Sequence, residues 1–81
     1  MTYFVKIHGS RSYYRVTAHF ETSNKGYRTL HIDSTEQISE RAYYAAPADA
    51  RFIREDLRDP VHGWFHEIGN SAFFNRLDAI A

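Results

Sequence analysis

YYRVTAHFE, residues 13–21, is the stretch that decides the fold. Apolar or small side chains occupy every second position from Tyr14 to Phe20, and mostly polar side chains occupy the positions between them. Successive side chains of a β-strand point to opposite faces, so this alternation predicts a strand with one buried face. The opposite series begins at Tyr13 and includes His19, and we expect it to face outward.

Two neighbouring segments alternate in the same way, and turn-forming residues separate them from the central one. We therefore predict a three-stranded antiparallel sheet with strands at about 3–8, 13–21 and 27–33. Pairing Glu21 with Tyr27 around a five-residue loop that ends in glycine places His19 opposite Thr29. In this register the histidines of different strands are not adjacent.

The chain from residue 34 onward has the pattern of short helices. Ser34 and Gln37 have the spacing of a capping box, which predicts a helix start at that point. We predict three to four helices, at about 35–46, 48–58, 60–68 and 71–80. A sheet followed by helices is typical of an α+β fold, so we expect one α+β domain over 1–81 with the helices packed on one sheet face.

Composition limits the classes of function. The chain has 81 residues, no cysteine and a formal net charge of zero. Zero net charge argues against a strongly basic nucleic-acid coat and a strongly acidic DNA mimic, because each needs a large field of one sign. Nothing approaches the run of about 18 apolar residues that suggests a membrane span, so we expect a cytoplasmic protein with no membrane contact.

The neutral total hides a split between the two halves. Residues 1–33 carry five basic and two acidic side chains, whereas residues 34–81 carry five basic and eight acidic ones. We therefore predict that the outward sheet face binds a partner. Its candidate residues are Lys6, His8, Tyr13, Arg15, His19, Tyr27 and Arg28. An alternative acidic surface would use Glu36, Glu40, Glu55 and Asp56.

Catalytic and metal-binding patterns are weak. His62 and His66 have a spacing that can hold one metal ion, but Gly63 stands where a metalloprotease has glutamate. His8, His19 and His31 face outward on the predicted strands, where histidine is an ordinary half-exposed residue. No catalytic triad, phosphate loop or paired-carboxylate site is recognisable. We expect no metal, no cofactor and no enzymatic activity; a small metal-dependent enzyme using His62 and His66 is an alternative.

One short stretch resembles a known family. The residues Asp33-Ser34-Thr35-Glu36-Gln37, which follow antiparallel strands and open a predicted helix, resemble the same junction in small phage-encoded type I-F anti-CRISPR proteins. The resemblance implies a stoichiometric inhibitor in the host bacterial cytoplasm. Such a protein binds a subunit of a CRISPR surveillance complex and blocks recognition of the target nucleic acid.

The residues and the resemblance together predict a non-catalytic binding protein that docks on a host protein complex. Tyrosine and arginine, which are frequent in interface hot spots, suit a protein partner. The same rings and cations also suit single-stranded nucleic acid, which is the alternative partner. An exposed aromatic sheet face would also allow a homodimer.

Overall fold

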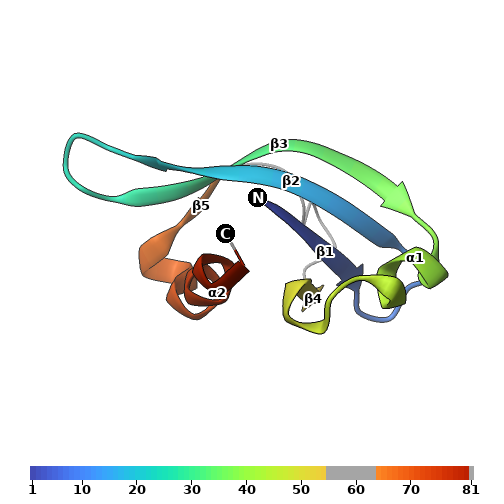
Figure 1. The fold of residues 1–81 in the computed structure, drawn as a ribbon. Helices are drawn as coiled ribbons and strands as arrows, with labels where there is room; N and C mark the ends of the chain where they lie inside the picture. The colour runs from blue at the N-terminus through green and yellow to red at the C-terminus, as the bar shows by residue number, and fades with distance from the viewer. Residues whose placement is uncertain (55–63, 81) are drawn as a thin grey trace.

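The computed structural model describes residues 1–54 and 64–80, and these residues form an α+β fold around one mixed sheet (Figure 1). The sheet has the strand order β4-β1-β2-β3-β5, with β1 (Thr2–Ile7), β2 (Tyr13–Thr22), β3 (Arg28–Ile38), β4 (Arg51–Arg54) and β5 (Trp64–His66). The pairs β1–β2, β2–β3 and β3–β5 are antiparallel, whereas β4 runs parallel to β1. The α+β class and the three predicted strands are confirmed.

The third strand is longer than predicted, and the helix start at Ser34 is wrong. β3 continues to Ile38, and Ser34 and Thr35 pair with Thr17 and Val16 of β2. The predicted helix at 35–46 is reduced to α1 (Glu40–Ala45). Its N-cap is Ser39, whose Oγ accepts a hydrogen bond from the Ala42 amide at 3.1 Å. Pairing with a neighbouring strand outweighs a local capping signal here, because it satisfies the backbone along the whole segment.

Two segments predicted as helices contain strands instead. Within 48–58, residues Ala48–Ala50 form a short 3₁₀ helix, Arg51–Arg54 form β4, and residues 55–58 lie outside the described residues. Phe52 pairs with Val5 and is buried, which explains the strand. Within 60–68, residues 64–66 form β5 beside β3, and residues 60–63 lie outside the described residues.

The last predicted helix, at 71–80, is confirmed and begins earlier than expected, as α2 (Glu67–Ile80). Its Phe74 and Leu77 are fully buried against the inner sheet face, which contributes Val5, Val16 and Leu30. Figure 1 shows α2 lying across this concave side of the sheet. Burial of these apolar side chains is the main stabilising term available to a chain without disulfides.

The expectation that the helices cover one sheet face only is wrong. α1 covers the other face at the end where β2 begins and β3 ends. Tyr43 of α1 is 3% exposed, lies 5.2 Å from the Tyr13 ring and donates a hydrogen bond to the carbonyl of Phe52 at 3.0 Å. Tyr13 is paired with the half-buried Ile38 on β3. Burial of its aromatic ring beneath α1 is favourable because it removes apolar surface from water.

In the described ranges 1–54 and 64–80, neither α-helix has both the length and the apolar character that a bilayer crossing requires.

Candidate functional site

The outward face of β2 and β3 carries part of the predicted partner-binding set. Lys6, Arg15 and His19 lie on this face, on β1 and β2. His8 follows the end of β1 and is exposed, and Tyr27 is exposed in the loop before β3. Tyr13 belongs to the face by strand position, yet it is 4% exposed beneath α1, so the expectation of an exposed Tyr13 is wrong.

Arg28 does not belong to the outward face. Its guanidinium lies 4.3 Å from the centroid of the Phe20 ring and 5.3 Å from that of Phe74, on the side covered by α2. One of its nitrogens is 2.8 Å from an Asp78 carboxylate oxygen. Arg28 therefore links α2 to strands β2 and β3, and its predicted placement on the docking face is wrong.

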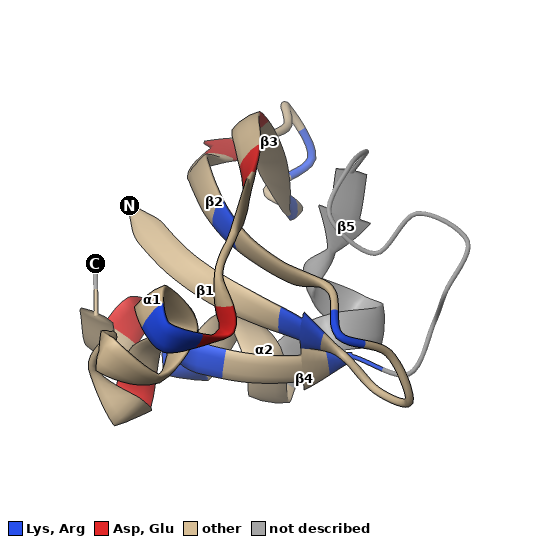
Figure 2. Ribbon diagram, turned by 90° about the vertical axis from the view of Figure 1, so that its right-hand side faces the viewer, with Lys and Arg blue, Asp and Glu red and all other residues tan. Residues whose placement is uncertain are grey.

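The outward face is balanced in charge rather than basic. Arg15 pairs with Glu36 on the neighbouring strand β3, and both side chains are about half exposed. Figure 2 shows acidic as well as basic segments along β2 and β3. Glu36 and Glu40, from the alternative acidic surface, lie on β3 and at the start of α1. The other two members of that surface, Glu55 and Asp56, lie outside the described residues.

Two histidines meet on this face, because the β2–β3 register differs by two residues from the predicted one. The loop closes between Ser23 and Tyr27, whose backbone atoms pair at 2.8 Å, and Gly26 in this loop has a φ of 83° that favours glycine. Glu21 consequently pairs with a residue further along β3, and His19 lies directly opposite His31. The two imidazole rings meet edge to face with centroids 5.0 Å apart.

A β-bulge adds a carboxylate to the pair of histidines. Thr17 pairs with Ser34 and Ala18 pairs with Ile32, so Asp33 is the extra residue of β3. Bulges re-aim a side chain and are frequent beside functional sites. Here the bulge brings Asp33 to 2.8 Å from Nδ1 of His19.

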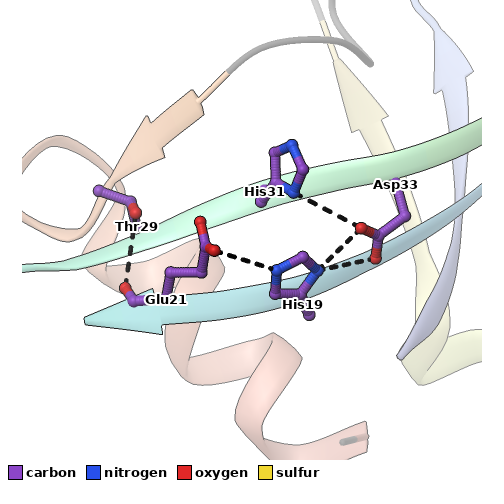
Figure 3. Close-up of polar contacts among 5 residues, drawn as sticks. All are labelled: His19, Glu21, Thr29, His31 and Asp33. Atoms are coloured by element: carbon purple, nitrogen blue, oxygen red, sulfur yellow. Dashed lines mark hydrogen bonds and ion pairs between the residues drawn. The ribbon is translucent and has the colours of Figure 1, made fainter. Parts of the chain in front are cut away.

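We call these four side chains, His19, Glu21, His31 and Asp33, the histidine cluster (Figure 3). Nε2 of His19 is 3.5 Å from a Glu21 oxygen, and Nδ1 of His31 is 3.5 Å from an Asp33 oxygen. Only the Asp33–His19 separation is a normal hydrogen-bond distance. The cluster is thus held by one short contact and two longer ones.

The charges of the cluster shift the pKa values of its members. The hydrogen bond to Asp33 raises the pKa of His19 above its ordinary 6.5, burial opposes this shift, and Glu21 adds to it. The same hydrogen bond lowers the pKa of Asp33 below its ordinary 3.8. The pair therefore stabilises the fold fully between these two ordinary values. The stabilisation is lost as pH rises through the raised pKa of His19, or falls through the lowered pKa of Asp33.

A second feature lies where β1, β4 and α1 meet. An open pocket of about 290 Å³, which we call the cation–tyrosine pocket, is lined by Lys6, Tyr43, Tyr44, Ala48, Arg51 and Ile53. Nζ of Lys6 donates a hydrogen bond to the Tyr44 hydroxyl at 3.3 Å, and the Arg51 guanidinium lies 5.6 Å from the Tyr44 ring centroid. Among the residues that the structure describes, this lining contains two cations and no carboxylate, so the pocket favours an anionic group.

The sequence pattern indicated Lys6 as a binding residue but not Tyr44, Arg51 or Ile53. Residues 51 and 53 fall in the helix predicted at 48–58, whereas the structure places them on β4. The sequence pattern also did not indicate Asp33, whose position depends on a bulge. His62 lies outside the described residues, as does the side chain of His66, so the predicted pairing of these two histidines stays a prediction.

Comparison of the chain with protein-family models, with curated proteins and with solved structures finds no match.

Proposed function

We propose that the protein is a non-catalytic binding protein that docks, through the cation–tyrosine pocket, onto an acidic segment of a protein partner. One observation carries the proposal. Among the described residues the large apolar side chains that are markedly exposed are Tyr27, Tyr44 and Ile53, and two of these three line the pocket beside Lys6 and Arg51. Apolar exposure and positive charge therefore coincide at one place.

The chemistry of the pocket suits a short segment with carboxylates around an apolar side chain. Ile53 is 64% exposed and Tyr44 is 49% exposed, so both have apolar surface to bury on binding. The hydrogen bond to Tyr44 raises the pKa of Lys6, which keeps the ammonium charged at neutral pH. An ammonium has three N–H donors, and Tyr44 accepts only one of them. Tyrosine and arginine are also the residue types that most often dominate binding energy at interfaces.

A single-stranded nucleic acid is the alternative partner, and two features of the outward face count against it. The platform expected there needs stacked rings and free cations, but Tyr13 is covered by α1 and Arg15 is paired with Glu36. Affinity for a labelled oligonucleotide that falls steeply with added salt would favour this alternative over the protein partner.

The resemblance to anti-CRISPR proteins implies a more specific partner, namely a subunit of a CRISPR surveillance complex. This partner stays a prediction. The stretch from Asp33 to Gln37, on which the resemblance rests, lies inside β3 and does not begin a helix. The resemblance at this junction therefore concerns the residues themselves and not a helix start. The homodimer and the metal-dependent enzyme using His62 and His66 also stay predictions.

The proposal is tested by binding of peptides to the full chain. Fluorescence anisotropy with a labelled peptide set should select sequences in which Asp or Glu flank a Leu or Phe, over scrambled basic and neutral peptides. Arg51→Glu and Ile53→Asp should each weaken that binding at least tenfold, whereas Lys25→Glu, an exposed loop change outside the pocket, should leave it within twofold.

Circular dichroism of each variant checks that the fold is kept. Equal binding by the wild type and by correctly folded Arg51→Glu and Ile53→Asp would refute the proposed surface. Selection of basic peptides would refute the proposed partner chemistry.

A further inference from the structure

We infer that the histidine cluster is a binding site for one divalent transition-metal ion of the zinc class, with His19, Glu21 and His31 as ligands and Asp33 as the residue that orients His19. The inference does not depend on the proposed docking function, because it concerns other residues at another part of the outward face. It goes against the expectation from sequence that the histidines on the strands hold no metal.

The spacing of the donor atoms carries the inference. One ligand atom from each of His19, Glu21 and His31 can be chosen so that all three lie within 4.8 Å of one another. Zinc binds nitrogen and oxygen at about 2.0–2.2 Å in tetrahedral sites, which separates neighbouring ligand atoms by about 3.4 Å. Nε2 of His19 and Oε1 of Glu21 are 3.5 Å apart, close to this edge length. Small side-chain rotations, which their half-exposed positions allow, would bring His31 to the same spacing.

Asp33 has the position of the outer partner that metal-binding histidines use. A ligating imidazole almost always donates its second ring N–H to a carboxylate, a carbonyl or water. Nδ1 of His19 is 2.8 Å from Asp33, so a proton on Nδ1 is held there and the lone pair is left on Nε2. Nε2 is the nitrogen beside Glu21, as Figure 3 shows.

The charge of the cluster suits a divalent cation. With neutral imidazoles, Glu21 and Asp33 bring two negative charges to the cluster. The described side chains within ion-pair distance of these two carboxylates are those of His19 and His31. A proton on His19 neutralises one of these charges, whereas a divalent ion neutralises both. Two imidazoles and one carboxylate, without thiolate, favour zinc, nickel, copper or iron over magnesium and calcium.

The backbone places the ligands before any metal arrives. His19 and His31 are directly paired across β2 and β3, and the bulge at Asp33 adds the orienting carboxylate. Three protein ligands leave one tetrahedral position open, which is the arrangement of reactive rather than purely structural zinc sites. The cluster faces outward with its side chains about half exposed, so this position is accessible to water or to a donor group from another molecule.

Zinc binding to the full chain, purified without a histidine tag, tests the inference. Isothermal titration with zinc chloride should show one equivalent bound. His19→Ala and His31→Gln should each weaken binding at least tenfold, and Asp33→Asn should weaken it about tenfold to a hundredfold, the usual effect of losing an orienting carboxylate. The matched control is His8→Ala, which removes an exposed histidine outside the cluster and should leave the affinity unchanged.

Substitution of His62 and His66 together separates this site from the pair predicted from sequence. That variant should still bind one equivalent of zinc. In wild-type protein, zinc should shift the ring ¹H–¹⁵N signals of His19 and His31 but not those of His8, and this readout holds even if a cluster variant folds poorly. The inference is overturned if no zinc is bound, if the His19 and His31 signals do not move, or if binding is lost only with His62 and His66.

Discussion

Tyr13→Ala should destabilise the fold strongly, although the sequence alone places this side chain on an exposed face. Tyr13 is 4% exposed, and its ring lies 5.2 Å from that of Tyr43 and 6.2 Å from that of Tyr44. Truncation of a buried aromatic side chain to alanine costs about 3–5 kcal/mol. We expect about 3 kcal/mol here, because the site lies at the end of the sheet and can partly collapse. A domain of this size has a free energy of unfolding of roughly 4–12 kcal/mol, so the loss is a quarter or more of the total.

Urea unfolding followed by circular dichroism measures this effect. Tyr27→Ala is the matched control, since Tyr27 is 52% exposed and its loss should change the free energy of unfolding by no more than about 0.5 kcal/mol. Tyr13→Phe keeps the ring and should cost less than about 1.5 kcal/mol. If Tyr13→Ala is as mild as Tyr27→Ala, then α1 does not cover the outward face and the reasoning fails.

Two further predictions test the helix start and the histidine cluster. Ser39→Ala removes the N-cap of α1 and should lower the free energy of unfolding by about 1 kcal/mol. Ser34→Ala, at the capping position expected from sequence, should change it by less than about 0.5 kcal/mol. A larger loss for Ser34→Ala than for Ser39→Ala would support the predicted helix at 35–46. In chelator-treated protein, NMR titration should show that Asp33→Asn lowers the pKa of His19 towards its ordinary 6.5, because Asp33 is the largest cause of its raised value; an unchanged pKa would exclude the hydrogen bond between them.

Period-2 alternation predicted the first three strands well, because each strand buries one face and every second residue of it is therefore apolar. The same logic failed for β4, whose four residues are too few to show a period and whose partner is the distant β1. It failed for the end of β3 for another reason. The residues from Ser34 to Gln37 do have the chemistry of a helix start, and only the presence of β2 alongside decides between cap and strand.

Prediction of the histidine cluster required the strand register, which the sequence contains only indirectly. The outward positions of His19 and His31 followed from alternation, but their adjacency depended on where the loop before β3 is centred. The predicted pairing of Glu21 with Tyr27 centres this loop one residue earlier, which would place His31 opposite Thr17 instead of His19. Alternation also places Asp33 on the outward face, but its approach to His19 depends on a bulge, and no local composition marks this bulge.

The two surfaces proposed here lie on one sheet face yet should act independently. Lys6 is paired with Tyr13 on β2, and His19 is six positions further along β2 than Tyr13. At about 3.3 Å per residue, the cation–tyrosine pocket and the histidine cluster are roughly 20 Å apart. This exceeds the Debye length of about 8–10 Å at moderate ionic strength, so a metal ion in the cluster should be largely screened from Lys6 and Arg51. Saturating zinc should therefore leave peptide affinity at the pocket almost unchanged, and either proposal can fail without the other.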